Sequence, residues 1–167
     1  MSQKHRRYTL KSRESRQIVT AVSRNLSINL EATLGPKVGI ETVDADFGEL
    51  LLVNGKPLLF KVGEAIYPTL QASAILAHLS KVIVDMGAVR FVCNGADVMA
   101  PGIVDFEGDF SKGDILVVMD VTHRKPLALG DALYPIGEAE GKRQGSVVKN
   151  RHYVGDKIWN FAKTLTE

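Results

Sequence analysis

The sequence predicts an α+β protein in which a small N-terminal α/β domain, residues 1–80, precedes a β-rich C-terminal domain, residues 81–167. Three observations support this. The chain has 167 residues, 45% of them apolar and 24% charged, which is the composition of a globular protein. Its first part mixes a helical apolar period with alternating strands. From Lys81 onward, glycine and proline separate short apolar runs.

A strand and an amphipathic helix open the N-terminal domain. Tyr8–Leu10 is predicted as a short strand, and Ser12 as the N-cap of a helix that runs to about Leu26. At 100° per residue the helix gathers apolar residues on one side and basic residues on the other. The apolar side holds Ile18, Val19, Ala21, Val22 and Leu26, and the outer side holds Arg13, Arg16, Thr20 and Arg24. The basic side is either a nucleic-acid contact or only a solubilising face.

Strands with a hairpin come next. The predicted strands are Val38–Val43, Leu50–Val53 and Leu58–Val62. Asn54-Gly55 between apolar runs is a strong hairpin signal, because both central residues need a positive φ. The segment 67–69 should stop the sheet, with Thr69 capping a helix through Leu79.

The C-terminal domain is predicted to be a small barrel or sandwich. Many short strands at regular spacing are typical of those folds. The expected strands are Val82–Val84, Ile103–Phe106, Ile115–Val121, Leu127–Tyr134 and Ser146–Lys149, with one or two helical turns over Gly87–Asn94.

Charge is concentrated at the two ends of the chain. Residues 1–24 carry seven basic side chains and one acidic one, and residues 142–163 carry six and one. Residues 25–141 carry eight basic and sixteen acidic side chains. This asymmetry indicates a polyanionic partner for the ends, although two solvated surface segments remain an alternative.

Several function classes lack their signatures. No apolar run is long enough to span a membrane, and no apolar stretch follows the basic N-terminus as in a secretory signal. The single cysteine, Cys93, allows no intrachain disulfide and is read as a small buried apolar residue. No phosphate loop, dinucleotide fingerprint, nucleophile elbow or H-E-x-x-H motif occurs. We therefore expect a cytoplasmic protein with no catalytic residue, metal or cofactor.

Three segments resemble the PUA domain, an RNA-binding module. They read GAVRFVCNGADVMAPGI at 87–103, KGDILV at 112–117 and PLALG at 126–130, and the resemblance spans about residues 81–156. With VNGKPLLF at 53–60, YPTL at 67–70, NRHY at 150–153, Asp156 and Trp159, nearly the whole chain resembles the malignant-T-cell-amplified (MCT) family. That resemblance implies a small N-terminal α/β domain before a C-terminal PUA β-barrel.

The resemblance also implies a function. MCT-like proteins bind RNA in translation, at the tRNA acceptor end or on the small ribosomal subunit, and act with a partner translation factor in initiation or recycling. The expected partners are therefore tRNA or rRNA, the small ribosomal subunit and a translation factor, with no DNA and no membrane. Two alternatives stay open: an RNA-guiding accessory subunit of a tRNA-modifying enzyme, and a protein-interaction module.

The resemblance places RNA against the short helix, the Gly-Ala loop and a late strand. Gly95 and Ala96 would form the loop, where backbone N–H groups approach a phosphate or base edge. The other expected roles are phosphate pairing by Arg90, base hydrogen bonding by Asn94 and Asp97, an apolar shelf from Met99 and Pro101, and charge and stacking from Lys149, Arg151 and Tyr153. In the alternative reading, Gly95, Met99 and Pro101 only shape the barrel turn, with Met99 in the core.

Overall fold

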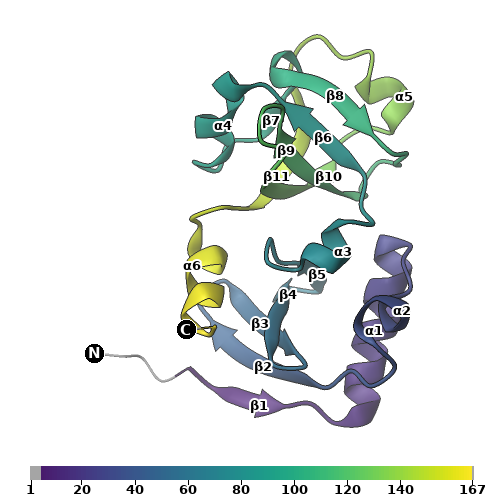
Figure 1. The fold of residues 1–167 in the computed structure, drawn as a ribbon, viewed down its shortest axis with the longest axis vertical. Coiled ribbons are helices and arrows are strands. Elements are labelled where there is room, and N and C mark those ends of the chain that lie inside the picture. The colour runs from purple at the N-terminus through teal and green to yellow at the C-terminus, as the bar shows by residue number, and fades with distance from the viewer. Residues whose placement is uncertain (1–4, 167) are drawn as a thin grey trace. The chain divides into compact units, whose positions relative to one another are not determined.

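A five-stranded antiparallel sheet is the framework of the first of two structural units (Figure 1). The computed structural model describes residues 5–166. The first unit runs to Ala77 and includes residues from Asn160 onward, and the second comprises His78–Trp159. The architecture is α+β, as predicted. Residues after Trp159 group with the first unit, whereas the sequence pattern assigns them to the second domain.

The strands of the first unit lie in the sheet in chain order. They are β1 (Arg7–Thr9), β2 (Ile40–Ala45), β3 (Gly48–Val53), β4 (Lys56–Val62) and β5 (Ala65–Pro68). The helices of this part are α1 (Ser12–Leu26), α2 (Leu30–Leu34) and α3 (Ser73–Leu76). Strand β5 was not predicted, because Pro68 was taken as a sheet breaker. It lies at an edge of the sheet, where proline removes no ladder hydrogen bond.

Helix α1 is amphipathic, as predicted. Ser15, Val19, Val22 and Leu26 are buried, and Arg13, Arg16 and Arg24 are exposed. Two details differ from the prediction. The N-cap is Lys11 rather than Ser12, without a side-chain cap hydrogen bond, and Ala21 is exposed.

The predicted hairpin between β3 and β4 is confirmed. Asn54 has φ 50° and Gly55 has φ 85°, so both central residues are left-handed. The Asn54 side chain accepts a hydrogen bond from the Gly39 amide at 2.8 Å. Thr69 does not cap a helix. Its hydroxyl donates to the Pro57 carbonyl at 2.7 Å and so ties β5 to the start of β4.

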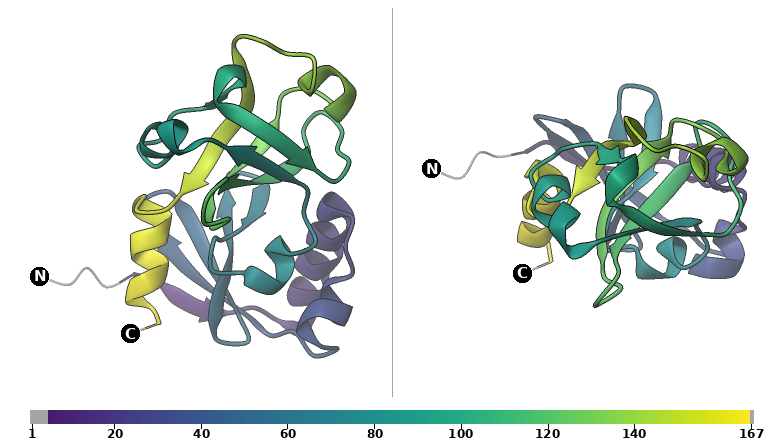
Figure 2. Two further views of the ribbon diagram at one scale, coloured as in Figure 1. Left: turned by 45° about the horizontal axis from the view of Figure 1, so that its top comes forward. Right: turned by 90° about the horizontal axis from the view of Figure 1, so that it is seen from above.

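The second unit is built on a curled mixed sheet (Figure 2). Its strands are β6 (Lys81–Val84), β7 (Val98–Met99), β8 (Ile103–Glu107), β9 (Ile115–Asp120), β10 (Pro126–Ala132) and β11 (Ser146–Tyr153), in the order β7-β11-β10-β9-β6-β8. The pair β6–β9 is parallel and the others are antiparallel. Its short helices are α4 (Met86–Val92), the 3-10 turn η1 (Ala100–Gly102) and α5 (Ile136–Ala139), and α6 (Lys157–Thr164) follows β11.

A short connection in the chain brings the two edge strands of this sheet close together. Strands β7 and β8 lie at opposite ends of the strand order, yet only η1 separates them in sequence. A three-residue turn joins them only if the sheet curls, so η1 closes a small barrel. The interior is filled by residues such as Val84, Leu116 and Val148, all less than 1% exposed.

A bulge interrupts the pairing of β10 with β11. Leu129 pairs with His152 and Gly130 with Asn150, which leaves Arg151 as the extra residue. A Cβ on Gly130 would lie 2.3 Å from the Lys149 carbonyl oxygen, so only glycine fits at this position. Among residues 5–166, no helix is both long and apolar enough to cross a membrane.

Candidate nucleic-acid interface

The short helix α4 leads directly into the Gly-Ala loop of the second unit. Asp85 begins the helix, and its carboxylate accepts the Ala88 amide at 2.9 Å. After Cys93 the chain turns sharply, with Gly95 at φ 96°. The amides of Gly95 and Ala96 donate to the carbonyls of Val92 and Phe91, at 3.1 and 3.0 Å. Both amides therefore already donate hydrogen bonds within the loop, which makes a direct contact of these two N–H groups with a phosphate less favourable than expected.

Asn150 on β11 joins the loop to the strand. Its Nδ2 donates to the carbonyl of Val92 at 3.0 Å and to that of Ala96 at 2.9 Å. Its own amide donates to the Asp97 carboxylate at 3.0 Å. The Oδ1 atom is buried without a hydrogen-bond partner. One side chain thus fixes the end of α4 and the loop against β11.

Sequence reasoning did not assign Asn150 to the site. Asparagine is depleted in β-strands, so its presence between Lys149 and Arg151 is the sequence signal that this side chain makes hydrogen bonds outside the sheet.

Gly95 and Tyr153 are packed together. A Cβ added to Gly95 would lie 3.2 Å from the Tyr153 ring and 3.3 Å from its hydroxyl oxygen. Tyr153 is partly buried against the barrel core. Tyr153, which was predicted to stack on a base, therefore packs against the loop at Gly95.

Carboxylates accompany the basic residues of β11. Lys149 Nζ lies 3.9 Å from Asp97 Oδ1, and Arg151 Nε donates to Asp131 at 2.7 Å. Both basic side chains stay about half exposed, at 50% and 44%. Arg151 is thus already in an ion pair, whereas Lys149 is only loosely paired. Asp97 is half-buried and bonded to β11, so its carboxylate positions the strand.

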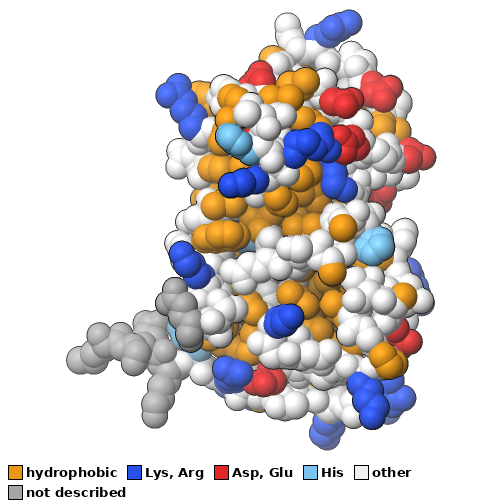
Figure 3. Space-filling model, viewed as in Figure 1, with side chains coloured by type: hydrophobic (Ala, Val, Ile, Leu, Met, Phe, Trp, Pro, Cys, Tyr) orange, Lys and Arg blue, Asp and Glu red, His pale blue; other side chains and the backbone are white. Residues whose placement is uncertain are grey.

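Apolar side chains are exposed beside the loop. Phe91 is 55% and Met99 48% exposed, and the exposed Arg90 places its guanidinium 4.9 Å from the centre of the Phe91 ring. Phe91 and Met99, together with other residues of α4 and Pro101, border a hollow of about 440 Å³, named here the loop hollow. Met99 is thus a surface residue rather than a core residue. Figure 3 shows, for the face it presents, hydrophobic side chains on the second unit among Lys and Arg side chains.

The predicted residues fall into three groups. Arg90, Asn94 and Met99 are exposed around the loop. A second group stabilises the loop through hydrogen bonds or packing: Gly95, Ala96, Asp97 and Tyr153. Lys149 and Arg151 flank Asn150 on the adjacent strand. The loop and Asp97 are thus in contact with Lys149, Asn150 and Tyr153 of β11. By contrast, Arg90 contacts Phe91 on α4, and Arg151 pairs with Asp131 on β10.

A buried His–Asp pair lies just after this strand. His152 is fully buried, and its Nδ1 lies 2.8 Å from the Asp156 carboxylate. That carboxylate also accepts the amides of Tyr153 and Trp159, at 2.9 and 2.7 Å. Burial opposes ionisation of Asp156, but the hydrogen bond and charge of His152 and the two amides outweigh it and lower its pKa.

The remaining candidates have little chemistry to offer. Burial raises the pKa of the Cys93 thiol, which is half-buried. Within residues 5–166 no group of three His, Cys, Asp or Glu side chains is arranged to hold a metal ion. In the first unit, Arg7 pairs with Glu41 at 2.6 Å, while Arg13, Arg16 and Arg24 remain exposed along α1.

Two family models match the chain. The PUA domain matches residues 80–154, and a domain of unknown function, DUF1947, matches residues 6–74. Together they cover the part of each unit that carries the sheet and the loop.

Similar proteins come from archaea and eukaryotes. An uncharacterized protein of Methanocaldococcus jannaschii is 38% identical, over 88% of this chain and 93% of its own length. Translation machinery-associated protein 20 of Saccharomyces cerevisiae is 30% identical over 68% of this chain and 67% of its own length. Malignant T-cell-amplified sequence 1 of Rattus norvegicus is 31% identical over 68% and 65%. The chain spans about two thirds of the length of these eukaryotic relatives.

Solved structures share the whole fold. A PUA-domain protein of Aeropyrum pernix, crystallised as a tartrate complex, matches with a TM-score of 0.87 at 27% identity over 98% of this chain and 94% of that one. A hypothetical protein of Pyrococcus horikoshii matches with a TM-score of 0.79 at 30% identity over 93% and 99%.

Proposed function

This chain belongs to the PUA-domain family that includes translation machinery-associated protein 20 and malignant T-cell-amplified sequence 1, and from this membership we propose that it binds RNA in translation. One observation supports this most directly. Asn150 holds the loop after α4 against β11, and exposed aromatic, thioether and basic side chains surround that loop. Single-stranded RNA is recognised by surfaces of this kind, which stack unpaired bases and pair with phosphates.

The RNA element is a single-stranded 3′ end, as at the acceptor end of tRNA. One base of this end would stack in the loop hollow against Phe91 and Met99. Asn94, which is exposed in the same loop, would hydrogen-bond a base edge. Arg90 and Lys149 contact phosphates, since neither is in a close ion pair. Arg151 contributes less, because it would first have to leave Asp131.

Gly95, Ala96, Asp97 and Tyr153 act by shaping the loop. The role is binding rather than catalysis. The cellular target is tRNA or rRNA on the small ribosomal subunit, with a translation factor as partner, in initiation or recycling. A second possibility keeps the same RNA site but assigns it to an accessory subunit of a tRNA-modifying enzyme.

Titration of labelled tRNA across salt concentrations tests the binding. With three to five phosphate contacts, the slope of log K against log salt is about −2 to −4, at roughly −0.7 to −0.9 per contact. Removal of the 3′-terminal nucleotides should weaken binding to the wild type and have little effect on Arg90→Glu. Arg24→Glu on α1 is the matched control with the same charge change. A flat salt response, or equal losses for both variants, would contradict the proposal.

Capture from native lysate separates the possible roles. Recovery of small ribosomal subunits supports the role in translation, and recovery of a modification enzyme supports the accessory role. An RNA-independent protein partner, with no tRNA binding, would assign the chain to protein interaction instead.

A further inference from the structure

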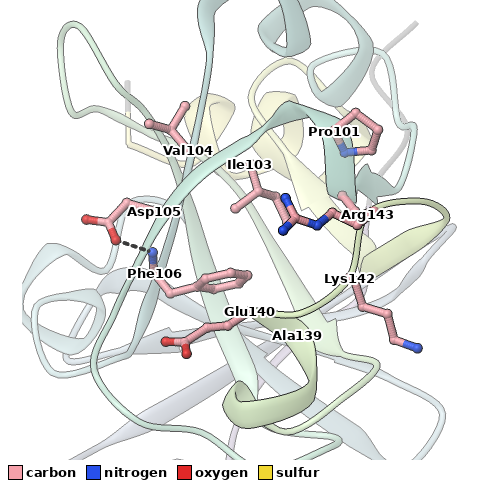
Figure 4. Close-up of a pocket in the computed structure, with 10 residues that line it drawn as sticks. Pro101, Ile103, Val104, Asp105, Phe106, Ala139, Glu140, Lys142 and Arg143 are labelled. Carbon is pink, nitrogen blue, oxygen red and sulfur yellow. Dashed lines mark hydrogen bonds between the residues drawn. The ribbon is translucent and has the colours of Figure 1, made fainter.

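A second hollow lies on the other side of the turn that closes the barrel. It measures about 540 Å³, within the range of small-ligand sites, and lies between β8 and the segment 139–143 (Figure 4). The side chains of Ile103 and Phe106 point into it, and the Arg143 guanidinium lies beside Ile103. This second hollow is distinct from the loop hollow and shares no charged residue with it.

The two hollows are adjacent along the chain. Pro101, in the η1 turn, borders both of them. On one side of it lies the loop hollow with Met99 and Phe91, and on the other lies the second hollow with Ile103 and Phe106. A strand of RNA that leaves the loop hollow over Pro101 therefore enters the second hollow next.

The lining of the second hollow suits a nucleotide. Phe106 and Ile103 form an apolar floor on which a base can stack. Two carboxylates also line the hollow: that of Asp105 accepts the Phe106 amide at 2.8 Å, and that of Glu140 can accept hydrogen bonds from the exocyclic amino group of a base. Lys142 and Arg143 are both exposed on the segment that borders the hollow. The Arg143 guanidinium is directed toward Ile103, where it could pair with a phosphate, and the Lys142 ammonium points away from the other lining residues (Figure 4). Lys142 is held over the Tyr134 ring, with 4.2 Å from Nζ to its centre, and not by a carboxylate.

We propose that this second hollow binds one further nucleotide of the single-stranded RNA whose neighbouring nucleotide occupies the loop hollow. The inference rests on the proposed RNA-binding function and extends its footprint across Pro101. It also gives a role to the basic pair at 142–143, which the loop site does not use. Strand β8 is a sheet edge, so an extended peptide is the competing occupant, but backbone pairing along β8 would leave the two cations without a role.

Binding of RNA hairpins with 3′ tails of one to six nucleotides tests the footprint. In the wild type, affinity should rise once for the loop hollow and again, by about five-fold or more, when the tail reaches the second hollow. The double variant Lys142→Glu, Arg143→Glu should keep the first rise and lose the second. The matched control is Lys112→Glu, Lys125→Glu, which makes the same charge change at exposed lysines of the same unit that line neither hollow.

Photo-crosslinking of the unaltered protein gives an independent readout. With 5-iodouridine at successive tail positions, one position should crosslink to the peptide containing Phe91 and the next outward position to that containing Phe106. If crosslinks form only at Phe91, or if both double variants show the same second rise, the second hollow is not an RNA site although the proposed function stands. If an extended peptide protects β8 amides from hydrogen exchange and the RNA tail does not, the hollow belongs to a peptide. Absence of any tail-dependent binding would refute the proposed function itself.

Discussion

Replacement of Asn150 by alanine should loosen the loop on which the RNA site depends. The change removes two hydrogen bonds from Nδ2, to Val92 and Ala96, each worth about 1 kcal/mol net. It also removes the unpartnered Oδ1, which offsets part of that loss. The expected cost to the stability of the second unit is therefore about 1–2 kcal/mol. Asn150→Asp should cost more, because it places a carboxylate against two carbonyl oxygens that lose their donor.

Hydrogen exchange and RNA binding measure this effect together. In Asn150→Ala the amides of Gly95 and Ala96 should exchange about ten-fold faster or more, since about 1.4 kcal/mol of local stability is a factor of ten. The affinity for RNA should fall in parallel. Asn94→Ala is the matched control: the residue is exposed, so exchange should stay unchanged while affinity falls. Unchanged exchange in Asn150→Ala would refute the view that this side chain holds the loop.

Three further predictions concern single residues. Gly95→Ala should weaken RNA binding at least five-fold, because its Cβ meets the Tyr153 ring at φ 96°; Gly113→Ala, at φ 91° with open space around it, should cost only the backbone strain of about 1 kcal/mol and leave binding intact. The pKa of Asp156 is lowered in the folded protein, so its carboxylate stabilises the fold above the unfolded pKa of about 4, and this stabilisation is lost as the pH falls below that value. The free energy of unfolding of Asp156→Asn, measured in urea between pH 7 and 3, should therefore depend less on pH than that of the wild type. The same pH dependence in both proteins would contradict this. Cys93→Ala should leave RNA affinity within about three-fold, and the thiol should react slowly at pH 8 because burial raises its pKa; a ten-fold loss of affinity with the fold intact would make the cysteine part of the site.

The local sequence pattern was sufficient to predict most of the strands and the first helix. The hairpin at Asn54-Gly55 follows from backbone preference alone, and the buried face of α1 follows from the helical period. The elements β5, β7, α2, α5 and α6 were missed for a different reason. They are short, and their places depend on neighbours that are distant in sequence, as the Thr69–Pro57 hydrogen bond shows for the end of β5.

The sequence predicted which residues lie near the loop better than it predicted what each of them does. Several predicted residues of the loop and of β11 are in contact, as Lys149 and Asp97 are, but a sequence motif does not reveal which groups are already hydrogen-bonded within the fold. The amides of Gly95 and Ala96, the carboxylate of Asp97 and the guanidinium of Arg151 are all occupied within the fold. Only three-dimensional contacts identify Asn150 as the residue that joins them, because its two carbonyl partners lie more than fifty positions away in sequence.

The bulge at Gly130 has a consequence for how this unit can vary among relatives. Because the pairing of β10 with β11 is set by a glycine that faces the Lys149 carbonyl, the register does not depend on the length of the connection from 133 to 145. Within that connection, α5 is held by the buried Ala139, whereas residues 140–145 are all exposed. This exposed part can therefore differ in length while Lys149, Asn150 and Arg151 keep their places. Changes of length and charge in the exposed turn are thereby separated from the hydrogen bonds through which Asn150 holds the loop.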